Sequence, residues 1–260
     1  MYSKPRVIPV LGIIDNNLVK TINYKSPRYL GDPINAVKIF NGKYVDELIV
    51  TDIRASVENK PINFELLTHI AQQAFMPLGY GGGIRNFEDV KKIFRIGYEK
   101  VIFNTAFIDN PELIKRTVDF AGSQSVVIAL DFKKSALKKY SVYSKSGTVE
   151  SSLSIEEVVQ RIKYLSVGEI IVNVIDKDGT MTGYDLEIIK IISSLVEIPV
   201  IANTGAKNMN DFKLALVSGA HSVAASSLFV YYGNLRAILI TFPKEEELKN
   251  IQILRGVPNE

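Results

Sequence analysis

Short apolar runs alternate with amphipathic stretches along most of this chain. The runs cover residues 6–11, 47–52, 76–80, 100–104, 126–131, 169–174, 198–203 and 222–226. Most are apolar throughout their middles, which is typical of strands buried on both faces of a parallel sheet. Between them, residues 86–96, 185–196 and 208–217 repeat their apolar positions at helical spacing, and Asn110-Pro111 is a typical helix start. The pattern predicts eight strands alternating with about eight helices.

This alternation favours an α/β fold, a closed (β/α)8 TIM barrel that occupies residues 1–243. The rival fold, an open doubly wound sheet, requires a glycine-rich fingerprint after its first strand, and residues 11–17 contain none. Residues 132–150 interrupt the alternation and predict a long loop with a small hairpin. Residues 244–260 are charged and then contain glycine and proline, so we expect a final helix and a loose tail.

The two halves of the chain resemble each other. Residues 76–106 align with residues 198–228 without a gap and share seven of 31 positions. In both copies a proline opens a strand, a glycine follows its end and an asparagine caps a helix. We therefore expect two half-barrels, about 4–122 and 123–243, with two similar loops on opposite sides of one mouth. That geometry suits a ligand with two similar ends, such as a bisphosphate.

Composition excludes several classes of site. Without cysteine the chain has no disulfide, thiolate nucleophile or cysteine-ligated metal, and His69 and His221 are too few for a histidine-rich metal site. The 31 Lys and Arg exceed the 28 Asp and Glu by three charges, too few to indicate nucleic-acid binding. No apolar run reaches the roughly 18 residues that span a membrane, and no signal peptide is recognisable. We expect a cytoplasmic protein with no metal and no organic cofactor.

Glycine and small polar residues follow the predicted strands at their carboxyl ends, where the active sites of such barrels lie. They are Gly82, Gly83, Asn104 and Thr105 in the first half and Gly205, Ser226 and Ser227 in the second. A tight turn explains each glycine taken alone. The paired placement favours two phosphate sites, because glycine lets backbone N–H groups approach an anion closely.

Carboxylates also lie at the predicted mouth. Asp131 ends the fifth strand and is a candidate general acid or base, with an ion pair to Lys133 or Lys20 as the alternative. Asp52 and Asp178 are further candidates, and loop capping is their alternative explanation.

Charged residues begin four of the predicted strands, on the face opposite the mouth. They are Arg6, Glu47, Lys100 and Glu169, on strands one, two, four and six. Two cations and two anions in this arrangement either form a salt-bridged ring that closes the barrel or are ordinary surface charges.

Eight short motifs follow one another in a recognisable order. They are Ile8-Pro-Val-Leu, Gly31-Asp-Pro, Asp46-Glu-Leu, Gly81-Gly-Gly-Ile, Asn110-Pro-Glu-Leu-Ile, Phe120-Ala-Gly-Ser-Gln, Asp176-Lys-Asp-Gly-Thr and Gly183-Tyr-Asp-Leu-Glu. Together they closely resemble the cyclase subunit of imidazole glycerol phosphate synthase, of histidine biosynthesis. The resemblance covers about residues 4–240, and the run 176–187 is highly specific.

The resemblance implies a two-fold barrel that forms a heterodimer with a glutaminase subunit, docked at the face where the strands begin. It implies that ammonia passes through a charged gate, matched by Arg6, Glu47, Lys100 and Glu169. At the mouth the ammonia reacts with a ribulosyl bisphosphate, a phosphorylated small molecule. The family's two phosphate sites match the glycine, asparagine, threonine and serine positions named above, and the second of its two catalytic aspartates matches Asp131.

The sequence departs from the family at the first catalytic aspartate. The family reads Leu-Asp-Val where this chain reads Leu11-Gly12-Ile13. Glycine transfers no proton, so the loss of one carboxylate predicts a roughly 10²–10⁴-fold slower cyclisation. Asn203-Thr204-Gly205 also replaces the family's Ser-Gly-Gly, which restricts the approach of the backbone to a phosphate, and Asn173 stands near a family threonine.

A complete gate beside an incomplete acid–base pair resembles one branch of the family. Those members work with a second glutaminase-like subunit and supply ammonia to a sugar amidotransferase, which makes acetamidino groups for surface polysaccharide such as lipopolysaccharide. We therefore favour an ammonia-delivering subunit. Two alternatives stay open: a working cyclase in which Asp131 makes both proton transfers, and a non-catalytic scaffold that activates the glutaminase.

Overall fold

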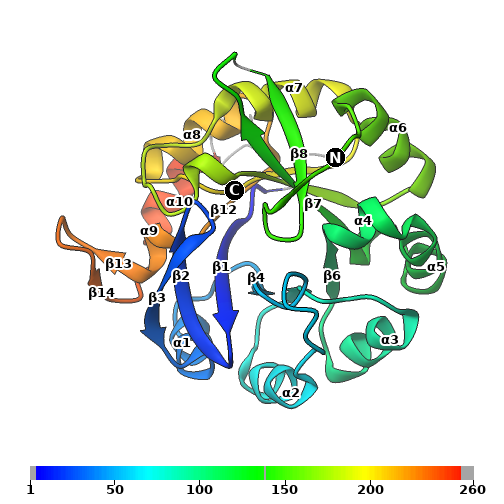
Figure 1. Cartoon of the computed structure of the whole chain (residues 1–260). Coiled ribbons are helices and arrows are strands. Elements are labelled where there is room, and N and C mark those ends of the chain that lie inside the picture. Colours follow the sequence, from blue (N-terminus) through cyan, green and yellow to red (C-terminus); the bar gives the residue numbers. More distant parts are fainter. Residues whose placement is uncertain (1–3, 138, 253–260) are drawn as a thin grey trace.

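Eight parallel strands close into a barrel in the computed structural model, which describes residues 4–137 and 139–252 (Figure 1). The strands are β1 (Val7–Ile14), β4 (Leu48–Asp52), β5 (Leu78–Gly81), β6 (Lys100–Phe103), β7 (Val126–Lys134), β10 (Glu169–Val174), β11 (Val200–Ala202) and β12 (Ser222–Ala225). β12 pairs with β1, and β7 pairs with β10, so the sheet has no free edge among these strands. The predicted (β/α)8 barrel is confirmed, and the open sheet is excluded.

Helices fill the connections and surround the barrel (Figure 1). They are α1 (Pro33–Asn41), α2 (Phe64–Gln73), α3 (Phe87–Ile96), α4 (Thr105–Asp109), α5 (Pro111–Ala121), α6 (Ile155–Leu165), α7 (Leu186–Leu195), α8 (Met209–Val217), α9 (Ser227–Val230) and α10 (Glu245–Gln252). The side chains of Asn86, Asp185 and Asn208 accept backbone N–H groups at the starts of α3, α7 and α8. The expected final helix is α10, and the expected tail at 253–260 lies outside the described residues.

The two aligned segments fold into equivalent elements. Residues 76–106 form β5, α3, β6 and the start of α4, and residues 198–228 form β11, α8, β12 and the start of α9. Both copies therefore place a glycine-containing loop and a helix start at the same end of the barrel.

An antiparallel ribbon of two strands follows β1, in a region where the hydrophobic pattern predicted no strand. β1 pairs with β2 (Asn17–Ile22), and β2 pairs with β3 (Lys25–Gly31). Asp15-Asn16 and Asn23-Tyr24 connect the strands with φ between 47° and 67°, as two-residue hairpin turns require. The hydrophobic pattern did not predict the β2–β3 ribbon, because two buried positions of β2 carry the polar residues Lys20 and Thr21.

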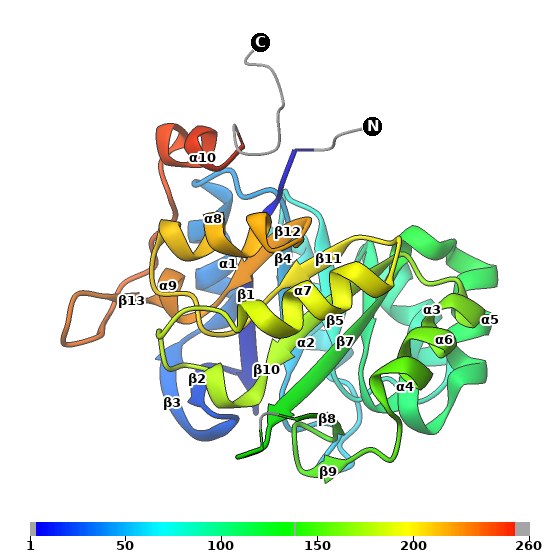
Figure 2. The same cartoon turned by 90° about the horizontal axis from the view of Figure 1, so that it is seen from above.

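The expected hairpin in residues 132–150 is present, and it begins earlier than expected. β7 continues past Asp131 to Lys134 and pairs with β8 (Tyr140–Ser144), which pairs with β9 (Val149–Glu150). In the side view, β3, β8 and β9 lie at one end of the barrel and α10 at the other (Figure 2). A separate hairpin, β13 (Tyr231–Tyr232) with β14 (Ala237–Ile238), projects from the side.

The interior of the barrel is layered. Because alternate residues of a strand share a face, Ile8 and Val10 of β1, and Val127 and Ala129 of β7, point into the barrel. They belong to an apolar cluster completed by Ile49, Ile102, Ile171, Ile201 and Ala224. A larger apolar cluster packs the strands against the helices. The inner cluster separates the charged starts of the strands from the polar residues at their ends.

Candidate functional site

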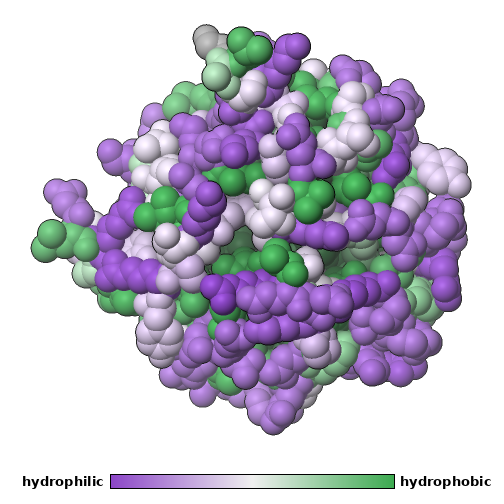
Figure 3. Space-filling view, in the orientation of Figure 1, coloured by the Kyte–Doolittle hydropathy of each residue, from purple (hydrophilic) through white to green (hydrophobic). Residues whose placement is uncertain are grey.

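A cavity of about 470 Å³ opens at the carboxyl ends of the strands. Figure 3 shows this face of the molecule hollowed at its centre, with apolar residues inside the hollow. The lining includes every mouth residue predicted from sequence: Gly12, Lys20, Asp52, Gly82, Gly83, Asn104, Thr105, Asp131, Asp178, Gly205, Ser226 and Ser227. The residues of the two half-barrels therefore meet in one cavity, large enough for a small phosphorylated molecule.

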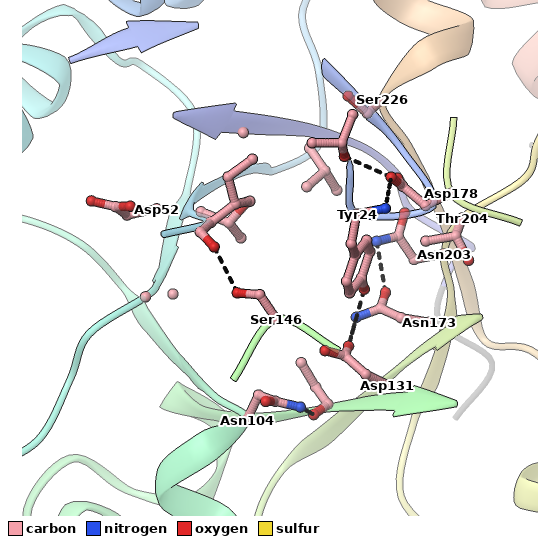
Figure 4. A pocket seen from close by; sticks show the side chains of 18 of the residues that line it. Tyr24, Asp52, Asn104, Asp131, Ser146, Asn173, Asp178, Asn203, Thr204 and Ser226 are labelled. Carbon is pink, nitrogen blue, oxygen red and sulfur yellow. Dashed lines mark hydrogen bonds between the residues drawn. The ribbon is translucent and has the colours of Figure 1, made fainter. Parts of the chain in front are cut away.

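Asp131 is held at the base of this cavity by one of its two oxygens. Tyr24 Oη donates to Asp131 Oδ1 at 3.1 Å, and Asn173 Nδ2 donates to the same oxygen at 2.7 Å (Figure 4). Asn203 Nδ2 in turn donates to Asn173 Oδ1 at 2.9 Å. No hydrogen bond within the described part of the chain uses Asp131 Oδ2, so this oxygen is available to a ligand.

Burial raises the pKa of Asp131 to about 6, against the opposing effect of the two hydrogen bonds. A carboxyl group with a pKa near neutrality exchanges protons readily at physiological pH, as a general acid or base must. Burial, and then the nearby Asp131 and Asp178 carboxylates, raise the pKa of Tyr24 well above its ordinary value, so its hydroxyl stays a donor.

Lys20 pairs with Asp178, so the alternative of an ion pair between Lys20 and Asp131 is not realised. Lys20 Nζ lies 2.5 Å from Asp178 Oδ1, and both side chains are buried. Asp178 Oδ2 accepts the hydroxyl of Thr21 at 2.6 Å and the backbone N–H of Tyr24 at 3.1 Å. Asp178 thus orders the β2–β3 ribbon and places Tyr24 over Asp131.

Asp52 caps a loop. Its Oδ1 accepts the backbone N–H groups of Arg54 at 3.1 Å and Ala55 at 3.0 Å. Burial raises the pKa of Asp52 above its ordinary value. The side chain therefore shapes the wall of the cavity, as its alternative explanation proposed.

The two glycine-containing loops differ in one residue that matters for anion binding. Gly82 has φ +121°, and a Cβ atom there would lie 2.5 Å from the carbonyl oxygen of Asp52, so only glycine fits. The equivalent residue in the second half is Thr204, with φ +67°. Thr204 Oγ1 accepts the backbone N–H of Val174 at 2.8 Å and donates to its carbonyl at 3.1 Å. The side chain of Thr204 thus ties the second loop to the end of β10, where the first loop has only glycine.

The helix starts beside these loops also differ. Asn104 Nδ2 donates to the carbonyls of Ala129 and Tyr143, and Thr105 Oγ1 accepts the N–H of Lys145. These side chains hold the ribbon that contains β8. In the second half, Ser227 Oγ is buried and has no hydrogen-bond partner within residues 4–137 and 139–252. Ser227 lines the cavity, at the position where the sequence predicts the second phosphate site.

Gly12 occupies the mouth layer of β1. It follows Ile8 and Val10 on the inward face, just as Asp131 follows Val127 and Ala129 on β7. A Cβ atom at Gly12 would lie 3.3 Å from the carbonyl oxygen of Val19, which is tight but not prohibitive. The cavity therefore presents Asp131 from the fifth barrel strand and no side chain from the first at this level.

Four charged side chains form a closed set of ion pairs at the opposite face. Arg6 lies 2.5 Å from both Glu47 and Glu169, and Lys100 lies 2.9 Å from Glu47 and 2.8 Å from Glu169. Glu47 is only 4% exposed in its side chain. These contacts exclude ordinary surface charge as the explanation and close the barrel below its apolar layer.

Tyr24 is a cavity residue that the sequence did not predict. Asn23, which favours left-handed turns, was a usable signal for the ribbon. Nothing local in the sequence relates Tyr24 to Asp131, because the contact spans 107 positions. Ser146 was also missed; its Oγ donates to the carbonyl of Ile53 at 2.6 Å and ties the β8–β9 turn to the cavity rim. The described residues contain no group of His, Cys, Asp and Glu arranged to hold a metal ion.

Comparison with known proteins identifies the family. The profile described as "Histidine biosynthesis protein" matches residues 6–236. The chain is 46% identical over 242 residues to "Putative imidazole glycerol phosphate synthase subunit HisF" of Leptospira borgpetersenii, covering 92% of this chain and 95% of the relative. It is 46% identical over 247 residues to "Putative imidazole glycerol phosphate synthase subunit hisF2" of Pseudomonas aeruginosa, covering 94% and 97%.

A third relative, "Imidazole glycerol phosphate synthase subunit HisF" of Alkaliphilus metalliredigens, is 39% identical over 227 residues, which cover 87% of this chain and 90% of the relative. Each helix in the described ranges is too short or too polar to cross a bilayer. The chain belongs to the HisF-like family of imidazole glycerol phosphate synthase cyclase subunits.

Proposed function

We propose that this protein delivers ammonia rather than cyclising a histidine precursor. In this account a glutaminase subunit docks at the face where the strands begin, as a heterodimer. Ammonia enters through the ring of Arg6, Glu47, Lys100 and Glu169 and leaves at the mouth. The observation that carries the proposal is the combination of a complete ring with Gly12 opposite Asp131.

The interior suits neutral ammonia. The layer between the ring and the mouth is formed by isoleucine, valine and alanine side chains. An ammonium ion would lose its hydration in this layer and find no polar partner, which costs a large free energy. Neutral ammonia has a much smaller free energy of desolvation. The ring holds the entrance closed in the isolated subunit, so docking of the glutaminase must rearrange it for passage.

The mouth supports loss of cyclisation. With Gly12 in the first barrel strand, Asp131 is the only one of the family's two acid–base carboxylates for which the cavity has an equivalent. One group must then make both proton transfers, which lowers the rate by roughly 10²–10⁴-fold. Thr204, whose side chain bonds to Val174, also restricts the approach of a phosphate to the backbone of the second loop.

The proposed acceptor is a sugar amidotransferase that forms acetamidino groups for surface polysaccharide. It would take ammonia at the mouth, where Ser227 and the glycine loop of the first half are suited to a phosphorylated small molecule. This assignment rests on the resemblance to the ammonia-supplying branch of the family, and the depleted acid–base pair supports it.

An isotope competition tests the proposal. The barrel, its glutaminase and the amidotransferase are mixed with ¹⁵N-amide glutamine and excess unlabelled ammonium, and the ¹⁵N content of the amidinated sugar is measured by mass spectrometry. We expect most product nitrogen to come from glutamine. With Lys100→Met, which removes two of the four ring contacts, the ¹⁵N fraction should fall at least severalfold toward that of bulk ammonium.

If the product made with the unaltered barrel had the same ¹⁵N fraction as the ammonia in bulk solution, passage of ammonia through the barrel would be contradicted. That result would favour a scaffold that only activates the glutaminase. A ratio unchanged by Lys100→Met would contradict the role of the ring. Lys60→Met is the matched control, because Lys60 pairs with Asp15 and Glu58 on the exposed surface.

A working cyclase is the second candidate, and one observation favours it. Asp131 has a pKa of about 6 and an Oδ2 atom without a partner in the described residues, which are the properties of an active acid–base group. Turnover of the ribulosyl bisphosphate with ammonium salt separates the two candidates.

A further inference from the structure

Two exposed aromatic side chains lie beside the charged ring. Tyr44 is 92% exposed in the loop between α1 and β4, and Phe75 is 90% exposed in the loop between α2 and β5. Both loops lie where helices return to the starts of strands, and Tyr44 precedes Glu47 of the ring by three residues. Among the described large apolar side chains, only Leu235 is more exposed.

The two loops are fastened to each other. Asn41, the last residue of α1, donates from Nδ2 to the carbonyl of Gln73 and accepts the N–H of Phe75 at 3.0 Å on Oδ1. The N–H of Tyr44 also bonds to the carbonyl of Asn41 at 3.2 Å, and Leu48 N–H to that of Pro77 at 2.9 Å. Both aromatic residues are thus presented on fixed backbone, which lowers the entropy lost when a partner binds.

Tyr44 is poorly explained by the stability of the isolated chain. Its φ is +53°, in the left-handed region where glycine is less strained than any other residue. Its side chain gains almost no burial in return. Phe75 likewise exposes nearly its whole ring to water. Aromatic side chains in such positions are typical binding anchors, because they bury a large area with few rotatable bonds.

We propose that Tyr44 and Phe75 are the anchor residues by which the ring-bearing face binds the glutaminase subunit. This inference rests on the proposed function and specifies its partner: a glutaminase whose docking surface carries apolar pockets for two aromatic rings. The glutaminase is the occupant because ammonia has to enter at the ring without escaping to water. The partner must therefore cover the surface around Glu47, which is where these loops lie. Val217, 73% exposed at the end of α8, extends the apolar character of the same face.

The test measures binding of the separately purified glutaminase to the full-length barrel by calorimetry. Phe75→Ala and Tyr44→Ala should each weaken binding at least tenfold. Tyr44→Gly should weaken binding equally and leave the melting temperature of the barrel unchanged or higher, because it removes the left-handed strain. Leu235→Ala is the matched control: Leu235 is 94% exposed but lies in the connection between β13 and β14, so its loss should change affinity less than twofold.

Binding of all variants with the unaltered affinity would overturn the anchor assignment and leave the proposed function standing. Failure of the unaltered barrel to bind the glutaminase would overturn the proposed function itself. A fall in melting temperature that parallels the loss of binding in Phe75→Ala and Tyr44→Ala would show a structural role and also overturn the anchors.

Discussion

The polar groups around Asp131 all converge on one oxygen. Tyr24 and Asn173 both donate to Oδ1, which fixes the carboxyl plane and leaves Oδ2 toward the cavity. An arrangement built for stability alone would satisfy both oxygens. The carboxyl group is therefore kept partly unsatisfied at a cost in stability, as is common at functional sites.

The free-energy cost of burying the Asp131 carboxylate makes the stability of the protein depend on pH. The pKa of Asp131 is about 6 in the folded protein and near its ordinary value of 3.8 when unfolded. The folded state therefore binds the proton more tightly, and its stability falls as pH rises from about 4 to about 6. Asp131→Asn keeps an acceptor for both donors and carries no charge. We expect it to raise the free energy of unfolding by about 2–3 kcal/mol at pH 8 and hardly at all at pH 4, measured by urea unfolding. An equal effect at both pH values would contradict the account.

Burial raises the pKa of Asp131, and the hydroxyl of Tyr24, like the amide of Asn173, opposes that rise. The hydrogen bond stabilises the carboxylate and lowers its pKa, so Tyr24→Phe should raise that pKa above about 6. The carbon chemical shift of the Asp131 carboxyl, followed against pH by NMR, measures it. Tyr143→Phe is the control, because its hydroxyl bonds to Glu150 outside the cavity. If the titration midpoint of Asp131 were the same in Tyr24→Phe as in the unaltered protein, the hydrogen bond between Tyr24 and Asp131 would be contradicted.

The β2–β3 ribbon is the element that turns an open barrel mouth into a cavity. It carries Lys20, Thr21 and Tyr24, and all three bond to Asp178, which follows β10. Leu18 and Leu30 of the ribbon pack into the main apolar core, whereas its turn at Asn23-Tyr24 is held by Asp178 through the backbone N–H groups of both residues. A segment held by a few polar contacts opens more easily than the packed core, so we expect the turn to be the part of the ribbon that depends most on this carboxylate.

Removing that carboxylate should release the ribbon. Asp178→Ala leaves Lys20 buried without its partner, so we expect a loss of about 3–5 kcal/mol in stability and faster amide hydrogen exchange over residues 17–31. Asp15→Ala, which breaks an exposed pair with Lys60, should cost at most about 1 kcal/mol. Equal effects of the two substitutions, or unchanged exchange in the ribbon, would contradict the role of Asp178.

The ribbon also marks the limit of what the hydrophobic pattern could predict. The eight barrel strands were predictable because each is a short apolar run, and α3 and α8 because Asn86 and Asn208 cap a periodic segment. The mouth residues were predictable because they end those strands. The pairing of Lys20 with Asp178 and of Tyr24 with Asp131 was not, because each contact joins residues more than 100 positions apart. Only the closed fold brings them together.

At the scale of the whole molecule, charge, apolar packing and polar groups follow one another along the barrel axis. A neutral ring of four ion-paired side chains closes one end, an apolar layer fills the middle, and the cavity with Asp131 opens at the other. This order of layers supports the proposed transfer of ammonia to the mouth. We propose that such transfer persists in this protein while cyclisation, which needs a second carboxylate, is slowed because Gly12 replaces the first one.

A cyclase assay separates ammonia delivery from cyclisation. The purified barrel receives the ribulosyl bisphosphate of histidine biosynthesis with excess ammonium salt, beside a Gly12→Asp variant, so no glutaminase is needed. We expect turnover by the natural protein to be about 10²–10⁴-fold slower than turnover by Gly12→Asp, whose new Cβ atom would lie 3.3 Å from the carbonyl oxygen of Val19, a tight but tolerable contact. Turnover by the natural protein at a rate within tenfold of Gly12→Asp would contradict the account and identify a working cyclase.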